Sequence, residues 1–520
     1  MQNKLERNWL SSQGLRLLII LILTLGLLFR WVNLDRKVYW EDEASTSLRV
    51  AGYTKIEFAR DVFNGQPIRV EELRRRYQYP NSERSVFHTL DALAGKAEHP
   101  PLYYLIARFW AQGFGSSIAV MRSLPALISL LAFPGMYWLC LELFNSPGVA
   151  WMAVALVTVS PIHVLYAQEA REYSLWTVAI LLSSAALLRS LRLKTNQSWG
   201  VYAATLALGL YSHLFFGLVA VGQGIYVAAT EGWRLSRNAI AYLLASLAGF
   251  LAFLPWIAAL IAYLIYSPYP DSILEATGRE IPLDSLIGKW FRSINRFFHD
   301  ADLGSANILL VILAGYAIYF VCRHTPKRVW LFIVTLIGVT ALTLGLPDLI
   351  LGGQRSVRTR YLIPCAIGIE LAVAYLLTIQ STTALKAWQQ KIWQGVAVIL
   401  ITAGIVSCAV SAQAESWWNK NSSVNQHYPK LAQLINQAES PLVISDSSPT
   451  SILSLSHELE PNVTLQLVTQ PDVFDIGDRF TDVFLFNVSE PLLQRLQEEK
   501  NFRVELMLDK RKAKLWKLSR

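Results

Sequence analysis

Residues 15–44 read LRLLIILILTLGLLFRWVNLDRKVYWEDEA. The first twenty are predominantly apolar, which is about the length that an α-helix needs to cross the hydrocarbon core of a bilayer. Three carboxylates, those of Glu41, Asp42 and Glu43, follow within a few residues of the end of this span. Carboxylates just outside a membrane span suit a general base or a metal ligand that acts on a lipid-borne substrate. The alternative interpretation is a solvated acidic loop.

The composition of the whole chain indicates a membrane protein. Of its 520 residues, 53% are hydrophobic, only 16% are charged and 17 are Trp, a balance that is typical of chains that lie largely in lipid. Ten further apolar segments bring the expected crossings to eleven, so the sequence predicts an all-α polytopic membrane protein. These segments are 118–142, 149–166, 173–191, 199–211, 214–231, 239–265, 305–322, 329–346, 361–379 and 392–411.

Basic residues in the short loops predict the orientation of the chain, because short cytoplasmic loops are enriched in Lys and Arg. The N-terminus, with Lys4 and Arg7, is therefore expected in the cytoplasm, together with the basic loops around 189–194, 234–237, 323–328 and 386–391. The loops at 35–117, 167–172, 212–213, 266–304 and 347–360 are then outside. The net charge of +9 reflects topology and contact with lipid headgroups, and it gives no reason to expect nucleic-acid binding.

The chain divides into two predicted domains. Residues 1–411 form the transmembrane domain, which includes the long outer loop 35–117. Within that loop, 54–63 and 69–77 have the spacing of amphipathic helices that could lie in the membrane interface, and a short interfacial helix is expected to begin after His99. Residues 412–520 alternate plausible strands and helices, which predicts a small soluble α/β domain on the outer side.

Asp42 and Glu43 are the prime candidates for catalysis, since one carboxylate can accept a proton while the other orients it or binds a cation. A second charged cluster falls between two spans on the same outer side. Charges in so short a connection are costly unless they face a cavity or each other. The alternative is a Glu–Arg pair that caps two helix ends. The members of this cluster are Glu169, Arg171, Glu172 and Tyr173.

Further polar residues are expected on the same face of the membrane. His99 and His213 are candidate substrate contacts, and a structural role is the alternative for each. Three arginines, Arg355, Arg358 and Arg360, precede Tyr361 at the outer end of a span. Guanidinium groups beside an apolar groove suit a lipid-linked phosphate, and snorkelling to lipid headgroups is the competing explanation. The convergence of these residues favours an outer-facing site for a lipid-linked substrate.

Four short motifs occur in an order that resembles the GT-C glycosyltransferases. They are WEDEA at 40–44, HPPLYY at 99–104, SP…YAQEAREYS at 160–174 and RTRYLIP at 358–364. The chain is most similar to the bacterial family 39 branch, which is related to protein O-mannosyltransferases and the lipid A aminoarabinose transferase. The resemblance covers roughly residues 15–411, and it implies a GT-C-like fold with about 11 to 13 transmembrane helices.

The resemblance implies an activity as well. Members of this family transfer a sugar from a polyprenyl-phosphate donor by a direct inverting displacement, on the periplasmic face of the bacterial plasma (inner) membrane. Asp42 matches the catalytic carboxylate of the family, with Glu43 beside it. Family members differ in metal use, so a divalent metal held by Asp42, Glu169 or Glu172 is left open. The acceptor, a lipid, a glycan or a protein, is not indicated by the sequence.

A transporter or flippase of lipid-linked sugars is the alternative from another functional class. Such a protein is expected to show inverted repeats and broken helices that meet at the middle of the membrane. The polar clusters of this sequence gather at the outer rim instead, which favours an enzyme.

Overall fold

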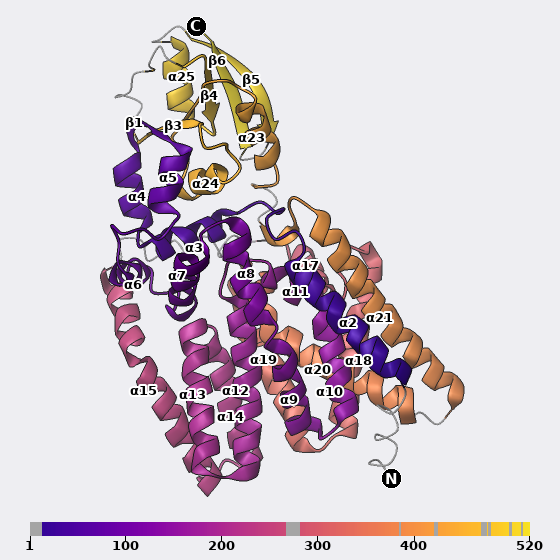
Figure 1. The fold of residues 1–520 in the computed structure, drawn as a ribbon. Helices are drawn as coiled ribbons and strands as arrows, with labels where there is room; N and C mark the ends of the chain where they lie inside the picture. Colours follow the sequence, from indigo (N-terminus) through magenta and orange to yellow (C-terminus); the bar gives the residue numbers. More distant parts are fainter. Residues whose placement is uncertain are drawn as a thin grey trace.

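The structure, a computed structural model, describes residues 13–266, 281–383, 386–420, 425–469, 476, 480–498, 502–510 and 513–519. A long bundle of helices carries a smaller α/β layer at one end, with a group of short helices between the two (Figure 1). The bundle contains α2 Gln13–Trp31, α8 Ile118–Ser129, α9 Ala132–Phe144, α10 Pro147–Val159, α11 Pro161–Ala167, α12 Tyr173–Leu193, α13 Asn196–Ser212, α14 Phe216–Thr230, α15 Arg237–Tyr266, α18 Ile308–His324, α19 Lys327–Ile350, α20 Ile363–Thr383 and α21 Ala387–Gln413.

Seven helical segments within the described residues are long and apolar enough to cross a membrane, or eight if the pair α10 and α11, bent by 57°, counts as one span. The expected segments 15–34, 199–211 and 214–231 correspond to α2, α13 and α14, which are not among these seven. They pack on the bundle nevertheless, α2 against α10, α13 against α12 and α14 against α19. A multi-pass helical architecture is therefore confirmed, and the count of eleven crossings stays a prediction.

The long outer loop folds into short helices and one strand at the end of the bundle. These elements are α3 Glu41–Ala51, α4 Lys55–Val62, β1 Asn64–Arg69, α5 Val70–Tyr77, α6 Val86–Ala94 and α7 Leu102–Phe114. The amphipathic segments predicted at 54–63 and 69–77 are helices α4 and α5, and the helix predicted after His99 is α7. Helices α4 and α5 lie under the α/β layer rather than along the rim of the bundle (Figure 1).

The α/β layer is a mixed sheet of six strands in the order β1-β3-β2-β4-β6-β5. Its strands at the C-terminal end are β2 Pro441–Ser445, β3 Thr464–Val468, β4 Asp482–Phe486, β5 Arg503–Lys510 and β6 Ala513–Ser519, with helices α23 Tyr428–Asn436, α24 Pro449–Ser456 and α25 Glu490–Glu498. Strands β2, β3 and β4 pair in parallel and are almost fully buried, which is why they read as continuous apolar runs. All five strands predicted beyond residue 412 are present.

The edge strand β1 comes from the outer loop and pairs antiparallel with β3, with Ile68 opposite Leu465. The sheet therefore crosses the domain boundary predicted at residue 411. Helix α24 also packs against α3, the helix that carries the three carboxylates of the opening motif. The α/β layer is thus joined to the motif region by backbone pairing and by helix packing.

Candidate active site

The carboxylate motif forms the first turn of α3. Trp40 is extended and precedes the helix, and Gly52, with a φ of 92°, ends it in the left-handed conformation that glycine adopts without strain. Glu41, Asp42 and Glu43 occupy the first turn, where the positive end of the helix dipole favours negative charge. The sequence thus builds a helix whose N-terminus concentrates three carboxylates, and these three side chains point to different surroundings.

Asp42 is partly accessible, with 34% of its side chain exposed. Its Oδ2 accepts a hydrogen bond from Arg360 Nη1 at 2.8 Å. Arg360 belongs to the short 3-10 turn η2 Thr359–Leu362 that precedes α20, and its guanidinium also lies over the Trp40 and Tyr361 rings. A residue of the first motif and a residue of the last of the four motifs are therefore in direct contact.

The pKa of Asp42 is set by two opposing effects. Burial disfavours its charged form, but the positive charges of Arg360 and Arg171 outweigh burial and hold the pKa at about 2. The carboxylate is consequently ionised at physiological pH. It is also a weak proton acceptor for as long as the Arg360 pair is closed.

Glu43 faces the opposite way, into the protein, and is fully buried. Arg122 of α8 binds both of its oxygens, through Nε at 2.8 Å and Nη2 at 2.7 Å. The Ala170 amide donates to Oε1 and the Lys420 ammonium to Oε2, each at 2.8 Å. Burial opposes ionisation, but Arg122 and Lys420 outweigh it and lower the pKa of Glu43 to about 2. Both oxygens of this carboxylate therefore accept hydrogen bonds from donors within the protein.

Glu169 lies beside this buried pair and is also fully buried. Its Oε2 accepts from Asn419 at 2.8 Å and faces the Lys420 ammonium at 3.5 Å. Burial raises the pKa of Glu169, Lys420 counteracts that rise, and the negative charge of Glu43 adds to it. Two carboxylates from distant parts of the sequence thus share one lysine.

Glu172 and Arg171 form a second buried ion pair, with Arg171 Nη2 at 3.0 Å from Glu172 Oε1. Tyr104 donates to Glu172 Oε2 at 3.2 Å, and His99 Nδ1 lies 3.6 Å from Oε1. Arg171 Nη1 also donates to Thr46 of α3 at 3.3 Å, one helical turn after Asp42. The predicted cluster and His99 therefore meet on the flank of α3.

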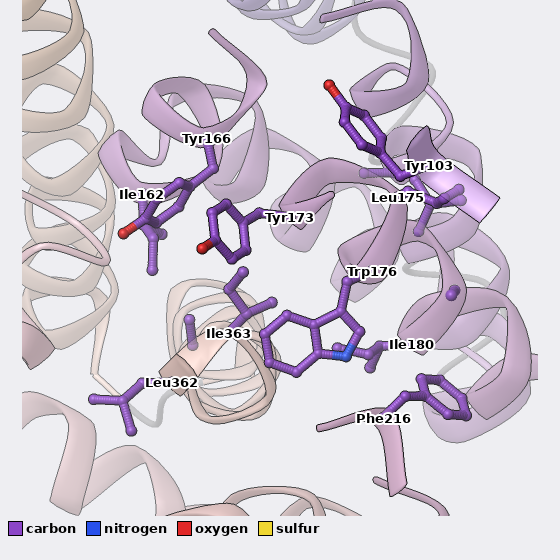
Figure 2. Close-up of a cluster of buried hydrophobic side chains, with 14 of the residues drawn as sticks. Tyr103, Ile162, Tyr166, Tyr173, Leu175, Trp176, Ile180, Phe216, Leu362 and Ile363 are labelled. Carbon is purple, nitrogen blue, oxygen red and sulfur yellow. The ribbon is translucent and has the colours of Figure 1, made fainter. Parts of the chain in front are cut away.

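Aromatic rings lie beneath these charges. His213 stacks on Trp176, with ring centroids 4.2 Å apart and planes at 11°, and it lies 6.3 Å from the Tyr361 ring. Tyr166 and Tyr173 lie side by side, 4.9 Å between centroids, and Ile363 of α20 lies below them in the view (Figure 2). Burial lowers the pKa of His213 to about 3. This imidazole is therefore neutral and acts as a flat polar surface.

The three predicted arginines diverge. Arg355 pairs with Asp348 at 3.2 Å, and Arg360 pairs with Asp42. Arg358 is exposed and lines a basic cavity of about 240 Å³ between the 3-10 turn η2 and helix α17 Leu283–Asn295. The full lining is Lys289, Arg292, Arg296, Gln354, Val357 and Arg358. Arg296 connects this cavity to the Asp42 side, because its Nη1 donates to Thr359 at 3.1 Å.

The carboxylates of this region do not fit a resident divalent metal. Asp42, Glu172 and Glu169 each have a cation within 3.5 Å, and a metal ion would have to displace these cations. Within the described residues no group of three His, Cys, Asp or Glu side chains is arranged to hold a metal ion. The four cysteines are free thiols dispersed through the helices.

Sequence reasoning missed Arg122, Lys420 and Tyr104. An arginine inside the apolar segment 118–142 was an available signal, because a charge within a membrane span is costly unless it is paired. Lys420 gave no such signal, since it lies in a polar stretch just beyond the last predicted span. Its two partners are 377 and 251 residues away.

Comparison with known proteins agrees with this architecture. Residues 98–267 match the family described as dolichyl-phosphate-mannose-protein mannosyltransferase. No curated protein matches the sequence. ArnT from Cupriavidus metallidurans, in its crystal structure with undecaprenyl phosphate, is similar over 97% of this chain and 98% of that one, with a TM-score of 0.55 and 14% identity. The oligosaccharyltransferase AglB from Archaeoglobus fulgidus, with an inhibitory peptide and a dolichol-phosphate, is similar over 88% of this chain and 64% of its own, with a TM-score of 0.50 and 12% identity.

At these identities the similarity to solved structures concerns the fold. The fold is that of the GT-C superfamily, and the resemblance that the sequence motifs indicate is confirmed at this level. The similarity to ArnT extends over nearly the whole chain, so it includes the α/β layer as well as the helical bundle.

Proposed function

We propose that this GT-C protein transfers a sugar from a polyprenyl-phosphate donor to an acceptor on the periplasmic face of a bacterial inner membrane, with inversion at the anomeric carbon. The observation that carries the proposal is the Asp42–Arg360 pair. A partly exposed carboxylate lies at one end of an apolar bundle, in contact with a guanidinium that can bind phosphate. That combination supplies a proton acceptor and a leaving-group partner within a few ångströms.

The displacement follows from these two groups. The acceptor oxygen attacks the anomeric carbon and forms the new glycosidic bond as the bond from that carbon to the phosphate oxygen breaks. The acceptor proton passes to the Asp42 carboxylate, and polyprenyl phosphate leaves with the electron pair of the broken bond. Arg360 stabilises the negative charge that develops on the departing phosphate.

Opening of the Asp42–Arg360 pair links donor binding to catalysis. With Arg360 in contact, the pKa of Asp42 is about 2, which is too low for an efficient general base near neutral pH. A donor phosphate that draws Arg360 toward itself removes the largest counter-charge from Asp42. The carboxylate then becomes more basic at the moment when the acceptor must lose its proton.

The basic cavity is the entry point that we propose for the donor phosphate. Arg358 and Lys289 line it with Arg292 and Arg296, and the Arg296–Thr359 hydrogen bond links this lining to the residue before Arg360. Guanidinium groups suit this role because they bind phosphate oxygens in pairs. The acceptor would approach from the Asp42 side.

The remaining predicted residues have supporting roles in this proposal. Glu43 and Glu169 are held inside the protein and position α3 and the loop that begins with Glu169. Glu172, Arg171 and His99 form the polar flank of the site. Tyr361 is partly exposed and can offer a flat aromatic surface on which a sugar ring stacks, and the buried His213 and Tyr173 lie behind it.

Replacement of the proposed base tests the function directly. Asp42→Asn should lower kcat at least about a hundredfold, the usual scale for loss of a general base, and should leave the yield of folded protein nearly unchanged. The assay measures transfer from a panel of polyprenyl-phosphate-sugars to lipid, glycan and peptide acceptors. Asp91→Asn, an exposed change on α6 of the same loop, is the matched control. Full transfer by Asp42→Asn would remove Asp42 from the mechanism, and donor translocation without any transfer would favour the flippase alternative.

A further inference from the structure

Lys420 is a buried cation that the proposed chemistry does not use. It lies in the 3-10 turn η3 Trp418–Lys420, between the last long helix α21 and the α/β layer. Its side chain is fully buried, and its ammonium donates to Glu43 Oε2 at 2.8 Å and to Glu169 Oε2 at 3.5 Å. A lysine is rarely buried to this degree unless its charge is paired.

The charges around Lys420 form one buried cluster. Glu43 is bound by Arg122 and by Lys420, and Glu169 faces Lys420. Lys37 lies near this set and donates to Gln168 at 3.3 Å; burial and the charges of Lys420 and Arg122 lower its pKa to about 7. Arg122 and Lys420 both contact Glu43, so Glu43 keeps a cation without Lys420, whereas Lys420 is the cation in contact with Glu169.

Removal of Lys420 would leave two carboxylates facing each other in a space that excludes water. Buried like charges that lose a shared counter-charge disfavour one another strongly. Glu43 lies one residue from Asp42 in the first turn of α3, and Glu169 lies two residues from Arg171, whose charge acts on Asp42. A displacement of either carboxylate would reach Asp42 from one side or the other.

We propose that Lys420 is a positioning residue of the active site: it neutralises Glu169 beside the Glu43–Arg122 pair and thereby fixes the turn of α3 that presents Asp42. This inference rests on the proposed function. It also gives the α/β layer a role, because the segment that leads into that layer delivers Lys420. Ser451 and Ser454 of α24 bind the same region, through Glu41 Oε1 and the Tyr39 carbonyl, each at 2.8 Å.

The test uses four variants of the full chain in the donor-dependent transfer assay. Lys420→Met removes the charge, Lys420→Arg retains it, and Lys420→Met combined with Glu169→Gln removes the lysine and the carboxylate it neutralises. Lys430→Met makes the same change at an exposed position of α23 and is the control. Each variant is measured for kcat, for the KM of the donor and for thermal unfolding in detergent.

Lys420→Met should lower kcat at least about tenfold with the donor KM within about threefold, because the donor phosphate is bound elsewhere. Lys420→Arg should retain a substantial part of the activity, and the double variant should recover kcat to within about threefold of the parent protein, since the buried charge is balanced again. A lysine that only fills space would give a double variant that is no better than Lys420→Met.

Two results would overturn the proposal: unchanged kcat in Lys420→Met, or failure of the double variant to improve on it. If Lys420→Met is not recovered as folded protein, recovery of folded and active double variant supports the proposal, and its failure to fold contradicts it. Asp42→Asn in the same assay separates the two levels of inference. An inactive Asp42→Asn with a fully active Lys420→Met rejects the positioning role alone, whereas an active Asp42→Asn rejects the proposed function.

Discussion

In the proposed mechanism, the Asp42–Arg360 ion pair must open before Asp42 can act as a general base and Arg360 can bind the donor phosphate. Their 2.8 Å contact satisfies two charges in the absence of donor, and it also keeps the carboxylate weakly basic. In this mechanism, the pair opens when a competing anion binds Arg360. Charge-assisted hydrogen bonds of this kind contribute about 1.5–3 kcal/mol each, a range that a phosphate with two acceptor oxygens can match.

Arg360→Ala tests the control of Asp42 by Arg360 through the pH dependence of turnover. Without Arg360, the effect of burial on Asp42 is no longer offset by its largest counter-charge, so the pKa of Asp42 rises from about 2. A base acts only when deprotonated, so the acid limb of kcat/KM, which reports the free enzyme, should move to higher pH in the variant. The kcat at neutral pH should fall as well, because the leaving phosphate loses its partner. A pH–rate profile that is unchanged would show that Arg360 does not control Asp42.

Arg358→Ala addresses the basic cavity separately. Arg358 is exposed, lines the cavity and does not touch Asp42, so its loss should weaken donor binding without a large effect on the chemical step. We expect the donor KM to rise about tenfold, the equivalent of one charge-assisted hydrogen bond, with kcat within about threefold. Lys391→Ala, an exposed change at the start of α21, is the control. An unchanged donor KM would place the phosphate elsewhere.

At the level of single residues, the sequence could indicate those side chains whose chemistry conflicts with their local surroundings. Asp42 and Arg360 stand out because each is charged beside an apolar span. Glu43 was indicated for the same reason, but the sequence could not tell that its oxygens would be taken by Arg122, Lys420 and a backbone amide. That outcome depends on contacts over long sequence separations, which carry no local pattern.

At the level of elements, Arg122 joins α8 to the segment that leads into α3. Besides both oxygens of Glu43, it binds the carbonyls of Leu34, Lys37 and Val38 at 2.7–2.8 Å. One buried side chain thus fixes the path of the chain from α2 to the first turn of α3. The arrangement also satisfies backbone carbonyls that would otherwise be buried without a donor.

Arg122→Met should therefore destabilise the protein severely. The substitution removes the guanidinium that binds both oxygens of the buried Glu43 carboxylate, and it removes the donor for three backbone carbonyls. The loss of one member of a buried ion pair costs about 3–5 kcal/mol. Thermal unfolding in detergent should shift to clearly lower temperature. Arg234→Met, an exposed change in the loop after α14, should leave the transition unchanged. Equal stability of the two variants would mean that Arg122 does not stabilise the fold.

Elements with a strong local pattern could be predicted, and β1 could not. Strands β2, β3 and β4 are short apolar runs between turn residues, and α4 and α5 have helical spacing, so the sequence indicates all five. Strand β1 reads NGQPIR, with a glycine and a proline that argue against a strand. It is tolerated because it lies at the edge of the sheet, where its register is irregular between Asn64 and Pro67. Only the partner strand β3 makes it a strand.

At the level of the whole molecule, the proposed site and the α/β layer lie at one end of the bundle, and the loop between α9 and α10 lies at the other (Figure 1). Those two regions must face opposite sides of a membrane if the bundle spans it. Basic residues mark the loops around 189–194 and 323–328, which join bundle helices at the end away from the sheet (Figure 1). The charge bias, applied to a molecule of this shape, predicts that the proposed site faces outward.

A pair of fusions tests this orientation. A reporter that is active only in the periplasm should be active when it is fused after Arg520, and inactive when it is inserted at 234–236, in the loop between α14 and α15. The two fusions control each other, because a protein that inserts at random would give partial activity in both. The reverse pattern would put the Asp42 site in the cytoplasm. A donor displayed on the cytoplasmic leaflet would then be required, and the basic loops would have to lie outside against the usual bias of short loops.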